Sequence, residues 1–140
     1  MSKLFEKIAE EIKTTGAIPF HRFMELGLYC PVYGYYEKEE DKIGKRGDYF
    51  TSVSVGSLFG QLLAAQFVEW LTAAGGVKNS QYRLAEAGAH RGDLARDILR
   101  DLRDCHPELY ANIRYVIVEP SSRRKEWQQQ NLNEFAGIVS

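Results

Sequence analysis

The sequence predicts an α/β fold in which a mostly helical first part precedes the beginning of an open parallel sheet. Apolar residues recur at helical spacing up to Gly76, and the pattern then changes to strand, helix, strand and helix. The second strand, IRYVIVE at residues 113–119, is apolar almost throughout, as expected for a parallel strand buried on both faces. We therefore expect a helical extension with a Tyr/Gly-rich loop over residues 1–76, and the first βαβα portion of an α/β domain over residues 77–140.

Two short helices are expected near the N-terminus. The first is marked by apolar residues at helical spacing: Leu4, Phe5, Ile8 and Ile12. Ser2 is a suitable N-cap for this helix, and Gly16 is a suitable end. The second helix covers residues 21–28, and four apolar side chains are expected to face inward from it: Phe20, Phe23, Met24 and Leu28.

A long irregular segment and a long helix complete the first part. The segment YCPVYGYYEKEEDKIGKRGDYFTS, residues 29–52, is rich in tyrosine, glycine and charge, and a short hairpin is expected near Tyr35 and Tyr36. The helix that follows is capped by Ser57 and ended by Gly75 and Gly76. Its expected apolar stripe consists of Leu58, Phe59, Leu62, Leu63, Trp70 and Leu71.

The run LAEAGAHRGDL, residues 84–94, is typical of a strand that enters a glycine turn and then a helix. A helix N-terminus presents unsatisfied N–H groups with a partial positive charge, and glycine lets a ligand approach the backbone closely. Ligands of open α/β sheets bind at the carboxyl ends of the strands, which places a candidate site at residues 88–92. The spacing Glu-x-Gly-x-His-x-Gly matches neither the dinucleotide fingerprint GxGxxG nor a P-loop.

An acidic residue, Glu119, ends the next strand, where a carboxylate can accept hydrogen bonds from both hydroxyls of a ribose. Together with the glycine turn it indicates an adenosine-containing cofactor, which need not carry a pyrophosphate. A structural alternative stays open. In that alternative Gly88 and Gly92 only shape a βα turn, and Glu119 only caps the following helix through its neighbouring serines.

Charge and composition exclude several classes of function. The chain carries 18 Lys and Arg against 19 Asp and Glu, so it lacks the basic excess of a nucleic-acid-binding surface. The most apolar segment, residues 58–74, is interrupted by Gln61, Gln66 and Glu69, which favours a buried helix over a membrane span. The histidines and cysteines match no common zinc spacing, so no metal is expected.

A cytoplasmic location is expected from two observations. Cys30 and Cys105 lie far apart and outside any CxxC pattern, which fits a reducing compartment. The first helix carries three acidic residues, Glu6, Glu10 and Glu11, which argue against a transit peptide.

Spaced motifs over residues 18–132 resemble one family, the MidA-like class I S-adenosylmethionine (SAM)-dependent methyltransferases, whose mitochondrial members are complex I assembly factors that methylate arginine. In the first part the motifs are Phe-Met at residues 23–24, Tyr-x-Pro-x-Tyr-Gly-Tyr-Tyr at 29–36, Gly-Asp-aromatic-x-Thr-Ser at 47–52 and Phe-Gly at 59–62. In the second part they are the glycine turn at 86–92 and VEPS at 118–121. The resemblance implies a Rossmann-like fold, SAM as cofactor and methyl transfer to a protein side chain.

The resemblance also implies which residues hold the cofactor. Glu86 would lie beside the methionine part of SAM and Glu119 at the ribose hydroxyls, while a loop that includes Thr51 would fold over the cofactor and the substrate entrance. The full implied set is Glu86, Gly88, Ala89, His90, Gly92, Glu119, Gly47, Asp48 and Thr51. No catalytic residue is identified.

Two substitutions depart from the family pattern. His90 replaces the middle glycine of the turn, although histidine tolerates left-handed backbone better than most residues do. Val53 and Ser54 stand where the family usually has Pro-Glu, which removes a carboxylate suited to orienting an arginine. Both substitutions favour an alternative function, a non-catalytic methyltransferase-like scaffold that binds a partner.

The chain carries only about two strands of the family's seven-stranded sheet. Two parallel strands cannot bury both of their faces and edges alone. Either a missing C-terminal portion of a longer protein completes the sheet, or self-association with another chain does.

Overall fold

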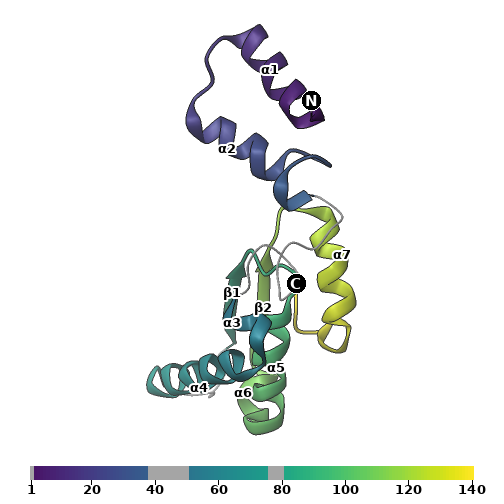
Figure 1. Ribbon diagram of the computed structural model, residues 1–140. Coiled ribbons are helices and arrows are strands. Elements are labelled where there is room, and N and C mark those ends of the chain that lie inside the picture. Colours follow the sequence, from purple (N-terminus) through teal and green to yellow (C-terminus); the bar gives the residue numbers. More distant parts are fainter. Residues whose placement is uncertain (1, 38–50, 76–80) are drawn as a thin grey trace. The chain divides into compact units, whose positions relative to one another are not determined.

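The computed structural model describes residues 2–37, 51–75 and 81–140, which fall into two compact units (Figure 1). The first unit is Met1–Tyr49 and the second is Phe50–Ser140. The boundary between them differs from the boundary at residues 76 and 77 expected from the sequence. The long helix before Gly75 packs against the helix that follows the glycine turn and belongs to the second unit.

The first unit contains two helices, α1 (Lys3–Thr15) and α2 (Phe20–Tyr29), and a short 3-10 helix, η1 (Tyr35–Glu37). As expected, Ser2 caps α1, with its side chain accepting the N–H of Phe5 at 3.3 Å, and Gly16 follows the last residue. The Arg22 guanidinium links the two helices, because its Nε lies 2.7 Å from Oε1 of Glu11.

Two expectations for this unit are wrong. Where a hairpin was expected, Tyr35 and Tyr36 belong to η1, and their rings meet edge to face at 5.0 Å. Side chains expected to face inward from α2 are largely exposed, with Phe20 at 75% and Phe23 at 46%. Helical spacing identifies an apolar face, but it does not identify what covers that face.

The second unit is an α/β unit, which confirms the expected fold class. Its elements are, in order, α3 (Ser52–Val55), α4 (Leu58–Ala73), β1 (Tyr82–Ala87), α5 (Asp93–Cys105), α6 (Pro107–Ala111), β2 (Ile113–Val118), α7 (Ser122–Asn131) and η2 (Asn133–Phe135). β1 and β2 are parallel neighbours, with Glu86 opposite Ile117 (Figure 1). Val139 forms a parallel bridge with Tyr115, so the chain after η2 pairs with β2 as the start of a third strand would.

The core of this unit joins α5 to β2 and η2. Its largest fully buried side chains are Ile98, Leu99, Leu102, Ile113 and Phe135. Full burial of a side chain of this size stabilises a fold by about 1.5–3 kcal/mol. Because three of these residues lie on α5, burial fixes the helix that follows the glycine turn. None of the described helices is both long and apolar enough to cross a membrane.

The contact face of α4 agrees only in part with the apolar stripe expected for it. Leu58, Leu62 and Trp70 are 66%, 61% and 59% exposed, whereas Gly60 and Ala64 are buried. A Cβ on Gly60 would lie 2.6 Å from the Cβ of Asp97 in α5. The helices approach closely through these small residues. Leu63 and Leu71 of the expected stripe pack against the core, whereas Leu58, Leu62 and Trp70 do not.

The sheet is covered on one face within the described residues. Ile113 and Tyr115 of β2 are buried. Arg114 and Val118, on the other face of the strand, are exposed, and Val118 is 57% exposed. The expectation that this strand is buried on both faces is therefore wrong for the described chain. An apolar run predicts a buried strand, but a second covering layer must supply the burial.

The packing of Gly60 predicts that Gly60→Ala destabilises the second unit. The added Cβ meets the Asp97 side chain and backbone, and such overpacking costs about 1–3 kcal/mol. Hydrogen exchange of α4 and α5 amides measures the loss. Gly27→Ala in α2 is the matched control, because nothing lies within 4 Å of its added Cβ. This control should leave α2 unchanged or stabilise it by up to about 1 kcal/mol, and equal effects at both sites would contradict the packing argument.

Candidate functional site

The glycine turn after β1 has alternating left-handed residues. The φ angles of Gly88, His90 and Gly92 are 70°, 51° and 80°. His90 therefore adopts left-handed backbone, in the place of the middle glycine. The Gly88 N–H donates to the carbonyl of Val118 at 3.2 Å, which extends the sheet ladder by one bond. Gly92 then forms the N-cap of α5, and its carbonyl accepts the Arg96 N–H at 3.0 Å.

Helix α7 packs directly against this turn. Gln128 Nε2 donates to the His90 carbonyl at 3.0 Å, and Asn131 Nδ2 donates to the Arg91 carbonyl at 2.9 Å. The rings of Trp127 and His90 meet edge to face with centroids 5.9 Å apart. Side chains of α7, which begins only after β2, therefore hold the turn.

Sequence motifs did not identify these α7 residues. Gln128 and Asn131 are polar, and polar residues on a helix are usually exposed. One signal was present: Trp127 and Asn131 are four residues apart, as are Gln128 and Leu132, so each pair lies on one side of the helix.

Glu119 lies at the end of β2, and only 2% of its side chain is exposed. Its Oε1 accepts the backbone N–H of Ser121 at 3.0 Å, and its Oε2 accepts Gln128 Nε2 at 3.4 Å. Nη1 of Arg124 lies 3.9 Å from the same Oε2. In the structural alternative Glu119 only caps the following helix, and the contact with Ser121 gives one of its oxygens this role. Each carboxylate oxygen has about two acceptor sites, so Glu119 retains capacity for ligand hydroxyls.

Glu86 is the penultimate residue of β1 and forms a hydrogen bond across the sheet. The Tyr115 hydroxyl donates to Oε2 of Glu86 at 2.9 Å. Burial raises the pKa of Glu86 above its ordinary value, and the hydrogen bond from Tyr115 partly opposes that rise. Burial and the neighbouring carboxylate also raise the pKa of Tyr115, so the phenol remains a donor.

The structure brings together six of the nine predicted site residues. The six are Glu86, Gly88, Ala89, His90, Gly92 and Glu119, at the carboxyl edge of β1 and β2. Gly47 and Asp48 lie outside the described residues. Thr51 is the N-cap residue of α3, where its N–H lies 3.4 Å from Oγ of Ser54, the residue that replaces the family's glutamate.

The edge formed by the six residues suits an adenosine-containing ligand. Nothing lies within 4 Å of a Cβ built on Gly88, so a ligand can approach the backbone there. Glu119 provides a buried acceptor at the end of the adjacent strand. In the part of the chain that the structure describes, no cluster of His, Cys, Asp or Glu could hold a metal ion.

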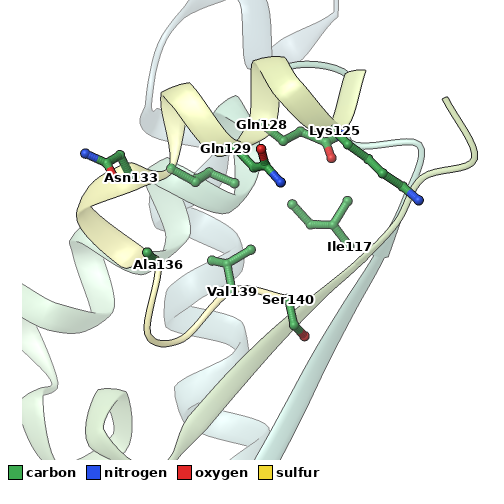
Figure 2. Close-up of a pocket in the computed structure, with 9 residues that line it drawn as sticks. Ile117, Lys125, Gln128, Gln129, Asn133, Ala136, Val139 and Ser140 are labelled. Carbon is green, nitrogen blue, oxygen red and sulfur yellow. The ribbon is translucent and has the colours of Figure 1, made fainter. Parts of the chain in front are cut away.

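A pocket of about 560 Å³ lies on α7 next to this edge (Figure 2). Figure 2 shows side chains of α7 on one side, Val139 and Ser140 on the other, and Ile117 of β2 between them. Its lining contains none of the six residues, although Gln128 belongs to the pocket and also contacts the turn. The pocket is therefore a neighbour of the candidate site and not the site itself.

The two outer glycines of the turn should differ in their response to alanine. Gly88→Ala and Gly92→Ala both force an L-residue into left-handed backbone, at about 1–2 kcal/mol each. Only at Gly92 does the new Cβ meet a neighbour, Cδ1 of the buried Leu132 at 2.7 Å. Urea unfolding followed by tryptophan fluorescence should show the larger loss for Gly92→Ala, and the reverse order would contradict the packing of α7 on the turn.

The Tyr115–Glu86 pair predicts a pH dependence of stability. Because the pKa of folded Glu86 lies above the unfolded value, its stabilising contribution is fully present below pH 4.5 and is lost as the pH rises through the folded pKa. Tyr115→Phe removes the hydrogen bond that lowers this pKa, so the loss of unfolding free energy between pH 4 and pH 7 should grow. Glu86→Gln is the control, because it should abolish this part of the pH dependence.

Curated relatives cover almost the whole chain. The protein arginine methyltransferase NDUFAF7, mitochondrial, of Rattus norvegicus is 33% identical over 136 residues, which are 96% of this chain and 30% of that protein. The protein of the same name from Danio rerio is 36% identical over 121 residues, which are 84% of this chain and 28% of that protein. The chain thus spans about 30% of the length of these relatives.

Solved structures share the fold. A crystal structure from Burkholderia thailandensis bound to S-adenosyl-homocysteine is 31% identical, with a TM-score of 0.74, and the match covers 98% of this chain and 36% of that chain. A native crystal structure from the same organism is 30% identical, with a TM-score of 0.72, over 98% of this chain and 33% of that chain.

The names of the relatives overturn one expectation. The relatives from Rattus norvegicus, Bos taurus and Homo sapiens are named as mitochondrial proteins, so the expectation of a cytoplasmic location is wrong. Two separated thiols and an acidic first helix do not identify a compartment.

The family model that matches residues 62–139 is described as "Putative S-adenosyl-L-methionine-dependent methyltransferase". The matched range contains β1, the glycine turn, β2 and α7, so it confirms the resemblance found in the motifs. This chain belongs to that family of S-adenosyl-L-methionine-dependent methyltransferases.

Proposed function

We propose that this chain forms the SAM-binding part of a methyltransferase that acts on a protein side chain. The observation that carries the proposal is the common edge at which Glu86, the glycine turn and Glu119 meet. Two further findings support it, namely membership of the family and the S-adenosyl-homocysteine bound to the similar protein from Burkholderia thailandensis. Residues 88–92 would approach the cofactor with their backbone, and Glu119 would accept the ribose hydroxyls.

Methyl transfer from SAM needs little acid–base catalysis. Bound SAM supplies a methyl group already activated by its sulfonium. The protein mainly has to hold the cofactor and align the acceptor, and such positioning contributes much of the rate of group-transfer reactions. This fits a site whose described residues are a backbone turn and two partly or wholly buried carboxylates.

We propose a protein side chain as acceptor, and arginine is the first to test because the curated relatives are named protein arginine methyltransferases. Arginine is commonly oriented by a carboxylate through paired hydrogen bonds. Ser54 stands where the family usually has a glutamate, and it lies within 3.4 Å of Thr51 in α3. An orienting carboxylate for arginine would therefore have to come from another position.

A non-catalytic scaffold is the second candidate. The observation that favours it is the burial of Glu119, whose carboxylate is contacted by Ser121, Gln128 and Arg124. On this alternative Glu119 would serve only to join β2 to α7. The two candidates differ in one measurable property, because a scaffold of this kind need not bind SAM.

Calorimetric titration of the complete gene product with S-adenosylhomocysteine tests the proposed function. We expect saturable binding, weakened about 10- to 100-fold by Glu119→Ala, as for a lost hydrogen bond to a charged group. Glu126→Ala is the matched control, because Glu126 is an exposed glutamate of α7. Tryptophan fluorescence verifies that each variant is folded. Absence of binding by folded wild-type protein would contradict the proposal and favour the scaffold.

A further inference from the structure

We propose that Gln128 is a positioning residue of the cofactor site, which fixes the glycine turn relative to Glu119. The inference rests on the proposed function, because it concerns the same site. Gln128 lies in α7 and is only 6% exposed. It belongs to none of the sequence motifs from which the cofactor residues were predicted.

The Gln128 amide reaches both halves of the site. Its Nε2 donates to the His90 carbonyl at 3.0 Å and lies 3.4 Å from Oε2 of Glu119. A primary amide has two N–H donors, so one nitrogen serves both acceptors at once. A single buried side chain therefore couples the turn after β1 to the carboxylate after β2.

This coupling would determine where Glu119 presents its remaining acceptor sites. The Ser121 N–H holds one carboxylate oxygen and Gln128 holds the other. Without Gln128 the carboxylate could turn about its bond to the chain, and its lone pairs would no longer face one fixed direction. A ligand held by the turn and by Glu119 at the same time requires both to keep their relative positions.

The aliphatic part of Gln128 lies beside the turn. A Cβ built on Gly92 would lie 3.7 Å from Cγ of Gln128, which is ordinary van der Waals contact. The methylene groups of Gln128 thus lie close to Gly92, while its amide binds the His90 carbonyl. A test variant should keep this volume and remove only the hydrogen bonds, which is what methionine does.

The test compares Gln128→Met with wild type in the complete gene product, using two ligands. The first ligand is S-adenosylhomocysteine, and the second is an analogue of it that lacks both ribose hydroxyls. We expect Gln128→Met to weaken binding of the first ligand about ten-fold and to change binding of the analogue much less. Gln129→Met is the matched control on the neighbouring exposed position, and it should bind both ligands as wild type does.

Each outcome separates this inference from the proposed function. If wild type does not bind S-adenosylhomocysteine, the proposed function fails and the inference fails with it. If wild type binds but Gln128→Met binds equally well, the inference alone is overturned. An equal loss for both ligands would also overturn it, because a residue that only supports the fold does not distinguish ligands by their ribose hydroxyls.

Gln128→Glu provides a second variant if the methionine variant does not fold. It keeps the length of the side chain and places a second carboxylate next to Glu119. Like charges at this distance repel, so S-adenosylhomocysteine should bind more weakly than to wild type by at least about ten-fold at neutral pH. Binding equal to that of wild type would overturn the inference.

Discussion

The parallel pairing of β1 with β2 is the contact on which the rest of the second unit depends. Because Ala87 lies opposite Val118, both strands end at the same edge, and the Gly88 N–H continues the ladder to the Val118 carbonyl. The crossover helix α5 buries its apolar face in the core and must begin immediately after the turn. Glu119 and the glycine turn, far apart in the sequence, therefore become neighbours through backbone geometry alone.

The turn itself depends on α7. An L-residue in left-handed backbone costs free energy that glycine does not, and His90 stands where the family pattern has its middle glycine. Here the carbonyl of His90 accepts a hydrogen bond from Gln128, and its ring contacts Trp127. Side-chain contacts with the following helix thus stabilise a conformation that glycine adopts without help. The histidine that departs from the family's turn is therefore compatible with its backbone.

Local sequence patterns predicted those elements of the second unit whose conformation depends mainly on neighbouring residues. The run LAEAGAHRGDL predicted a strand, a glycine turn and a helix, and the structure has β1, the turn and α5 in these places. Burial was harder, because it depends on what packs against an element. In α4 the small residues Gly60 and Ala64 are buried, while Leu58, Leu62 and Trp70 remain exposed.

The same reason explains which site residues were missed. Glu86 lies near the end of β1 and Glu119 directly follows β2, and strand ends are the expected place for ligand groups in α/β sheets. Gln128 and Asn131 lie inside a polar helix, where only the tertiary fold distinguishes an inward amide from a solvated one. Thr51 could be predicted only by resemblance, and in the structure it contacts Ser54 in α3.

Burial of Glu119 restricts how a ribose could reach it. Its Oε1 accepts the Ser121 N–H, at the N-cap of α7, at 3.0 Å. Gln128 is held at a second point by the His90 carbonyl. The contact with Arg124, at 3.9 Å, is the longest of the three and exceeds hydrogen-bond distance. A ribose hydroxyl can therefore replace Arg124 beside Oε2 more readily than it can replace Ser121 or Gln128, and these two contacts would keep the carboxylate oriented while it does so.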